Sequence, residues 1–130
     1  MKREDCVIPE SQRTFYDQFH FSPAVKDGDR LFCSGQIGIG ADGQVASDPE
    51  EQFTLAFEGV SAVLSEAGIT WSDVVEMTSY HVDMSKHLGT FMKVKNRFVN
   101  EPYPAWTAVG CSELAMPGGL AEVRVIARLP

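Results

Sequence analysis

Hydrophobic residues recur every three or four positions in one long segment, as they do on a single face of an α-helix. The apolar positions of this segment are Phe53, Phe57, Val60, Val63, Leu64 and Ala67. Asp48 is a good N-cap residue, and Glu51 follows it at the spacing of a capping box. Pro49 suits the first helical position, and Gly68 is a natural stop. The pattern predicts a helix between Asp48 and Gly68.

A second, shorter segment carries a stripe of the same kind, formed by Leu88, Phe91, Val94 and Phe98. Ser85 stands before the stripe, where its hydroxyl can cap a helix. Pro102 and Pro104 follow the stripe and end the helix, because proline cannot continue it. The pattern predicts a second helix that begins at Ser85.

Runs of β-branched and apolar residues predict five strands. Two of these runs flank Asp27-Gly28 and indicate a β-hairpin. The other three runs cover residues 74–82, 105–111 and 120–129. The predicted order is therefore β-β-α-β-α-β-β within one domain of residues 1–130. The polar residues 1–13 are expected to form a flexible arm.

The last strand alternates between two kinds of side chain. One side holds Ala121, Val123, Val125, Ala127 and Leu129, and the other holds Glu122, Arg124, Ile126 and Arg128. Right-handed crossovers would bring both helices to the same face of the sheet, over the apolar side. The mixed side is then either solvated or buried against another subunit, because few layers remain within the chain to cover it.

Composition narrows the classes of partner. The net charge is −7 and no basic patch is present, so neither nucleic acid nor an anionic membrane is an expected partner. The three cysteines, Cys6, Cys33 and Cys111, are far apart, which predicts free thiols in a reducing compartment. No apolar run approaches membrane-spanning length, and the polar start is unlike a signal peptide. We therefore expect a cytoplasmic protein.

No motif calls for a metal or a cofactor. His81, Asp83 and His87 are close in sequence, but lone histidines are more often structural or exposed than metal ligands. Cys111 has no evident adjacent base, which favours a small buried residue over a nucleophile. The glycines around Gly35 do not match a nucleotide-phosphate loop, and Gly35 is expected to allow close approach of a ligand or a neighbouring strand.

Five short motifs follow one another along the chain. They are Leu31-Phe32-Cys33-Ser34-Gly35-Gln36-Ile37, a helix from Glu51-Gln52 to Glu66-Ala67-Gly68, Asp73-Val74-Val75-Glu76-Met77-Thr78, Pro104-Ala105, and Glu122-Val123-Arg124-Val125-Ile126-Ala127. In order and spacing these motifs resemble the RidA/YjgF family, also called endoribonuclease L-PSP-like. The resemblance covers about residues 21–129.

The resemblance implies an α/β (α+β) fold of the chorismate-mutase-like type. It also implies a homotrimer whose sheets form a central barrel, with three clefts between subunits. Active members of the family hydrolyse enamines and imines derived from amino acids, without a cofactor. In these members an arginine after Pro-Ala holds the substrate carboxylate, and a glutamate on the last strand, here Glu122, positions or activates water.

The chain departs from the family pattern where the arginine is expected, because Trp106 stands there. An indole offers one N–H donor and no charge, so it cannot replace a guanidinium fork. Phe21 replaces a frequent tyrosine, and Met92 replaces an asparagine found in active members. The segment around Trp106 resembles the YjgH-like branch of the family. Trp106 could fill a subunit interface or form a wall on which a ligand stacks.

These residues define a candidate site and three candidate functions. Glu122 is the predicted catalytic residue, and the predicted substrate-binding residues are Trp106, Phe21, Gly35, Thr107 and Ala108. The first function is hydrolysis or deamination of a small imine, enamine or related carbonyl compound other than 2-aminoacrylate. The second is a trimer that binds a small ligand without turnover. The third, a ribonuclease, is implied only by the older family name and is disfavoured by the acidic charge.

Overall fold

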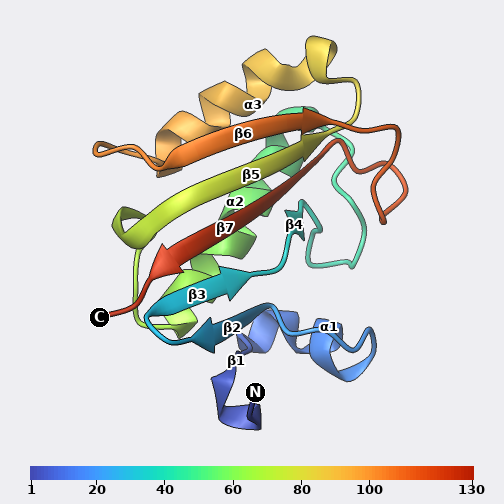
Figure 1. Cartoon of the computed structure of the whole chain (residues 1–130). Helices are drawn as coiled ribbons and strands as arrows, with labels where there is room; N and C mark the ends of the chain where they lie inside the picture. The colour runs from blue at the N-terminus through green and yellow to red at the C-terminus, as the bar shows by residue number, and fades with distance from the viewer.

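The computed structural model describes residues 1–130 and contains one seven-stranded mixed sheet with two long helices on one of its faces (Figure 1). The strands are β1 (Cys6–Val7), β2 (Ala24–Asp27), β3 (Arg30–Cys33), β4 (Gln36–Ile37), β5 (Val74–His81), β6 (Ala105–Gly110) and β7 (Ala121–Arg128). The helices are α1 (Arg13–Asp17), α2 (Pro49–Glu66) and α3 (Met84–Phe98), with 3-10 turns η1 (Arg3–Asp5), η2 (Glu10–Gln12) and η3 (Trp71–Asp73). The α+β class and the seven predicted elements are confirmed.

The sheet has the order β1-β2-β3-β7-β5-β6, and β4 pairs with β7 next to β3. Only β5 and β6 run parallel, because α3 connects them as a crossover. The predicted hairpin is formed by β2 and β3, in which Asp27 pairs with Arg30. Gly28 adopts a φ of 61° in the turn between them, a left-handed conformation that glycine tolerates without strain.

The long helix α2 begins and ends as predicted. The Asp48 carboxylate accepts a hydrogen bond from the backbone N–H of Glu51 at 3.0 Å, and Pro49 occupies the first helical position. Gly68 has a φ of 77°, which terminates the helix. The buried stripe consists of Gln52, Phe53, Ala56, Phe57, Val60, Val63 and Leu64.

The start of α3 differs from the prediction that Ser85 caps it. The N-cap residue is Asp83, with a φ of 52° and no side-chain capping bond. Its carbonyl accepts from the N–H groups of Lys86 and His87, so the backbone itself closes the first turn. The left-handed Asp83 lets the chain turn directly from β5 into α3, which explains the earlier start. Phe91 and Val94 are buried, as the stripe predicted.

The segment predicted as a flexible arm is folded against the sheet in this structure. β1 pairs antiparallel with β2, and Val7 and Ile8 are buried. The Gln12 side chain is also buried and donates from Nε2 to the Gly59 carbonyl at 2.9 Å. The short apolar run at Cys6-Val7-Ile8 explains the difference, because it is enough to extend the sheet by a two-residue strand.

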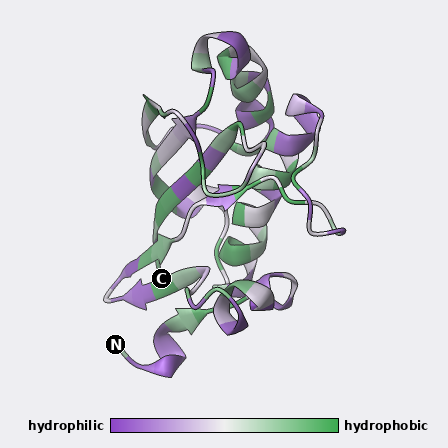
Figure 2. Cartoon of the chain, turned by 90° about the vertical axis from the view of Figure 1, so that its right-hand side faces the viewer, coloured by the Kyte–Doolittle hydropathy of each residue, from purple (hydrophilic) through white to green (hydrophobic).

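The two faces of the sheet differ as the last strand predicted. On β7 the residues Ala121, Val123, Val125 and Ala127 are buried under the helices, at 1% exposure or less. Glu122, Arg124 and Ile126 are half-buried on the opposite face, which no helix covers in Figure 1. Hydrophobic and hydrophilic residues alternate along the long strands in Figure 2. No helix of the chain has both the length and the apolar character needed to cross a bilayer.

Candidate functional site

Glu122 lies on β7, a central strand, on the sheet face without helices. Its register partners are Ile37 on β4 and Tyr80 on β5, and their side chains share that face. The carboxylate makes no hydrogen bond and no ion pair within the chain. Burial raises its pKa above the usual range of a glutamate, as expected when a carboxylate loses water without gaining a partner. Arg124, on the same strand, does not offset this shift.

Gly35 lies directly beneath the Glu122 side chain. A Cβ atom at this position would lie 2.6 Å from both Cγ and Cδ of Glu122, far inside van der Waals contact. Glycine is therefore required here if the carboxylate is to keep its position. The group that closely approaches Gly35 is the side chain of Glu122. The fold brings these two residues together although they are distant in sequence.

Phe21 lines a pocket of about 540 Å³ that includes neither Gly35 nor Glu122. The pocket is also lined by Ser34, the residue before Gly35, whose Oγ donates to the Ser22 carbonyl at 2.7 Å. The Phe21 ring stacks on Phe15 at 5.3 Å between centroids and keeps 40% of its surface exposed. Phe21, Ser34 and Gly35 thus belong to the same end of the sheet.

Trp106 points to the other face of the sheet, toward the helices. Its register partner is Met77, which is buried in the core, and its ring stacks on Phe91 of α3. The indole Nε1–H donates to Ser79 Oγ at 2.8 Å. Ala108 shares this face with Trp106, whereas Thr107 lies on the face of Glu122. The predicted site residues therefore form two groups within one chain.

Ser79 connects Trp106 to a buried histidine, and neither contact was predicted. The Ser79 hydroxyl lies 2.7 Å from His81 Nε2, and both residues are fully buried. Burial lowers the pKa of His81, so its ring is neutral at physiological pH. The signal in the sequence was a serine and a histidine two residues apart in a predicted strand, in register with the apolar Met77, which places all three on the same face.

The histidines and cysteines considered as metal ligands or nucleophiles do not form a site. Nowhere in the chain do three His, Cys, Asp or Glu side chains gather where they could share a metal ion. Cys111 is half-buried, and its backbone N–H donates to the His81 carbonyl. Cys33 is buried, which raises the pKa of its thiol to about 12 and leaves it without thiolate character at neutral pH.

These features define a small α+β protein whose helix-free sheet face carries a half-buried, unpaired glutamate. The family model described as Endoribonuclease L-PSP matches residues 12–129, and the chain belongs to this family. The predicted membership is therefore confirmed.

Similar proteins cover nearly the whole chain. It is 40% identical to "RutC family protein YjgH" of Escherichia coli, over 100% of this chain and 98% of that protein. The solved structure of YjgH has a TM-score of 0.89 and covers 96% of this chain and 95% of that one. RidA from an Antarctic Psychrobacter species has a TM-score of 0.78 at 30% identity, with 84% and 88% covered. TdcF of Escherichia coli with bound serine has a TM-score of 0.77 at 27% identity, with 85% and 88% covered.

Proposed function

We propose that this chain is a cofactor-free hydrolase of a small imine, enamine or related carbonyl compound, with Glu122 as its catalytic residue. The observation that carries the proposal is the unpaired, half-buried carboxylate of Glu122, whose pKa burial raises. A raised pKa suits a carboxyl group to proton transfer near neutral pH. A glutamate that served only solubility would be fully hydrated, and no glycine would be needed beneath it.

The proposed reaction consumes one water and releases ammonia. The Glu122 carboxylate accepts a proton from water as the water oxygen bonds to the imine carbon. The protonated carboxyl then donates that proton to the nitrogen, which gives a carbinolamine. Transfer of the hydroxyl proton to nitrogen by the same route breaks the carbon–nitrogen bond, leaving a carbonyl compound, ammonia and the original carboxylate.

A relative supports the substrate class. "Putative reactive intermediate deaminase TdcF" of Escherichia coli is 28% identical to the chain over 89 residues. One solved structure of TdcF holds serine. Those descriptions belong to TdcF, and they support the proposal that this chain also acts on a small molecule derived from an amino acid.

The proposed active form is a homotrimer with the site between subunits. Within one chain, Glu122, Gly35 and Phe21 lie apart from Trp106 and Ala108, which are on the helix side of the edge strand β6. A head-to-tail contact would set the β6 edge of one copy beside Glu122 of the next and join the two groups in one cleft. Such contacts close into rings when the rotation allows it.

The test of the catalytic role is Glu122→Gln, which keeps the shape of the side chain and removes its ionisation. Imines are generated in situ from a panel of amino acids by an amino-acid oxidase, and the rate of imine loss is measured. We expect turnover to fall by about 10²–10⁴-fold, the usual range for a general acid–base. Mass and circular dichroism should be unchanged. If Glu122→Gln consumed imine as fast as the wild-type protein, Glu122 would have no part in the mechanism.

Because Trp106 replaces the arginine, we expect 2-aminoacrylate to be a poor substrate. A lost bidentate contact to the carboxylate costs roughly 2–4 kcal/mol, which is about 30- to 1000-fold in rate. The assay couples the chain to a dehydratase that forms 2-aminoacrylate from serine, with an arginine-bearing family member as the reference. A rate comparable to the reference would show that the argument from Trp106 is wrong.

A second candidate is a trimer that binds a small ligand without turnover. The observation that favours it is the inward orientation of Trp106, whose indole N–H is already satisfied by Ser79. Binding of a ligand with no loss of imine across the whole panel would favour this candidate over hydrolysis.

A further inference from the structure

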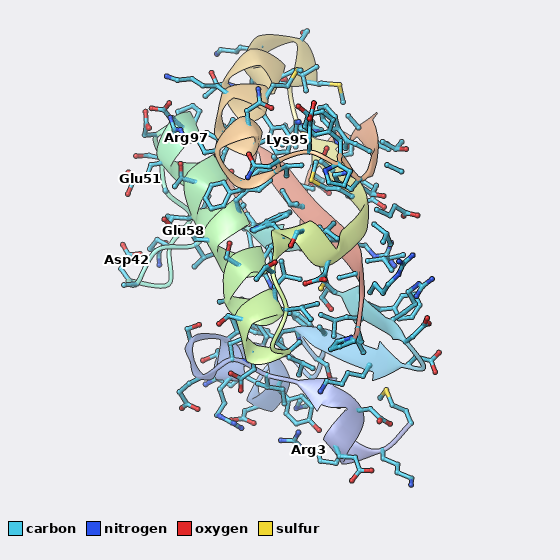
Figure 3. All side chains as sticks on the ribbon, turned by 90° about the vertical axis from the view of Figure 1, so that its left-hand side faces the viewer. Arg3, Asp42, Glu51, Glu58, Lys95 and Arg97 are labelled. Atoms are coloured by element: carbon cyan, nitrogen blue, oxygen red, sulfur yellow. The ribbon has the colours of Figure 1, made fainter.

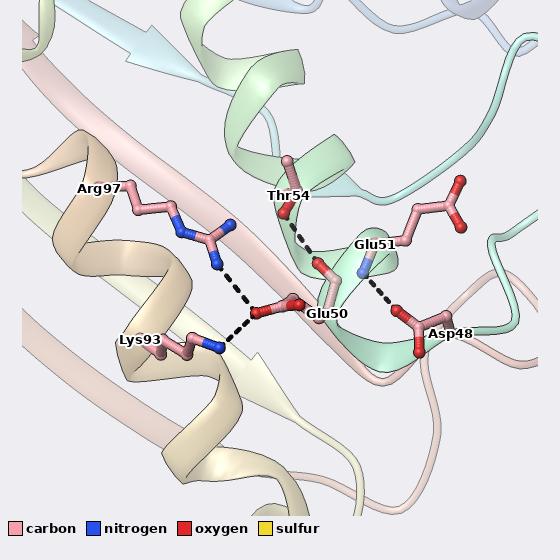
Figure 4. A network of polar contacts seen from close by, with 6 residues as sticks. All are labelled: Asp48, Glu50, Glu51, Thr54, Lys93 and Arg97. Atoms are coloured by element: carbon pink, nitrogen blue, oxygen red, sulfur yellow. Dashed lines mark hydrogen bonds and ion pairs between the residues drawn. The ribbon is translucent and has the colours of Figure 1, made fainter.

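Lys93, Lys95 and Arg97 stand at alternate positions in the second half of α3, and only two of them have an acidic partner. Lys93 and Arg97 each approach the Glu50 carboxylate of α2 at 2.9 Å, as Figure 4 shows. The Lys93 ammonium, followed by the Arg97 guanidinium, holds the pKa of Glu50 below its usual range. Lys95 forms no ion pair, although the chain carries a net charge of −7. In Figure 3 Lys95 and Arg97 are on different sides of α3.

The Lys95 ammonium is held over Trp106 instead. Its Nζ lies 4.9 Å from the centroid of the indole ring, within the range of a cation–π contact. One N–H donates to Asn96 Oδ1 at 3.1 Å, which leaves two of the three ammonium donors free. Lys95 is half-buried, so its charge is less screened than that of a fully solvated lysine. A positive charge therefore stands, unpaired, beside an aromatic surface.

Both groups line a groove of about 540 Å³ beside β6, the edge strand of the sheet. The apolar part of its wall includes Met77, Val99 and Trp106. Its polar part includes Asn96, Asn100 and Tyr103, which supply two amides and a phenol. The groove thus combines one cation, several neutral hydrogen-bonding groups and an apolar surface, which is the usual composition of a small-ligand site.

We propose that this groove binds a small organic carboxylate with a flat apolar body, the carboxylate on Lys95 and the body against Trp106. A single ammonium matches a single negative charge, and the neutral amides beside it can donate further hydrogen bonds to the carboxylate oxygens. The apolar wall would take the rest of the molecule. This binding needs no turnover, and all of its groups belong to one chain, in which Glu122 is on the other face of the sheet.

The same geometry explains which carboxylates should bind poorly. An ammonium is a point charge that orients a carboxylate less strictly than a guanidinium fork. Much of the affinity must then come from apolar contact, and a carboxylate with no apolar body should gain little. The proposal therefore agrees with the expectation that 2-aminoacrylate is a poor substrate.

The experiment uses Trp106 as the reporter. The chain has two tryptophans, so Trp71→Phe leaves Trp106 as the only indole. Benzoate is titrated into this variant at low ionic strength, with benzyl alcohol as the uncharged probe of similar size. We expect a saturable change in Trp106 emission with benzoate and a clearly weaker response to benzyl alcohol. Lys95→Met should weaken benzoate binding about tenfold or more, the usual effect of removing a charged hydrogen-bond partner.

A control variant and a second readout keep the outcome decisive. Lys93→Met removes a charge from the same helix, but on the side of Glu50, and should leave benzoate binding unchanged. The hydrolysis assay judges Glu122 by the rate of imine loss, whereas this titration judges Lys95 by benzoate binding, so that a failure of the proposed hydrolysis and a failure of this inference can be told apart. The indole N–H signals in proton NMR of the unchanged chain provide a second readout, in which Trp106 should shift and Trp71 should not. Absence of saturable binding, or equal binding by Lys95→Met, would overturn the proposal.

Discussion

At the scale of single residues, the half-buried position of Glu122 disfavours the charged form of its carboxyl group. Burial raises the folded-state pKa above that of the unfolded chain, so the folded protein prefers the protonated form. Stability from this group is complete below the unfolded-state pKa and is lost as the pH rises through the folded-state pKa. At neutral pH the chain therefore carries a destabilising charge, which is consistent with a residue retained for function.

Glu122→Gln should consequently be slightly more stable than the unchanged chain at neutral pH. We expect a gain below about 1 kcal/mol, because the carboxyl is only half-buried and solvent screens it. The gain should disappear near pH 3, about one unit below the usual pKa of glutamate, where both side chains are neutral. Urea unfolding at the two pH values measures it. Lower stability of Glu122→Gln at neutral pH would mean that the carboxylate makes a favourable contact.

At the scale of elements, α2 depends on a local signal at its N-terminus. Asp48→Ala removes the hydrogen bond to the Glu51 N–H and should lower the free energy of unfolding by about 1 kcal/mol. Glu58→Ala, at an exposed position in the middle of α2, is the matched control and should stay within about 0.5 kcal/mol. Urea unfolding of the three proteins provides the comparison. Equal stability of Asp48→Ala and the control would show that packing alone holds the first turn of α2.

At the scale of the whole molecule, the sheet face without helices is the surface that we expect to be buried between subunits of the homotrimer. This face carries Ile126, which is half-buried, and Phe32, whose side chain is 39% exposed. The chain mass is 14.3 kDa, and light scattering at micromolar concentration should give about three times that value for the proposed homotrimer. Ile126→Arg should shift the mass toward the monomer, whereas Glu58→Arg on α2 should not. A monomer mass for the unchanged chain would contradict the trimer.

The sequence by itself determined the elements whose signals are local. The Asp48 cap, the Gly68 stop and the apolar stripe define α2 within a single segment, and the alternation along residues 121–128 assigns each side chain to a face. The same alternation placed Glu122 on the mixed face, where burial raises the pKa of its carboxyl. The family motifs were also readable, because each lies within a single stretch of the sequence.

The tertiary structure alone decided the facts that depend on register and on distant partners. The residues of β6, from Ala105 to Gly110, show no alternation of polar and apolar side chains, so only the pairing of Trp106 with Met77 reveals that the indole points to the helices. β1 was missed because two residues become a strand only when β2 offers its edge. The unpaired charge of Lys95 was invisible for the same reason, since Glu50, which pairs with its neighbours Lys93 and Arg97, lies on another helix.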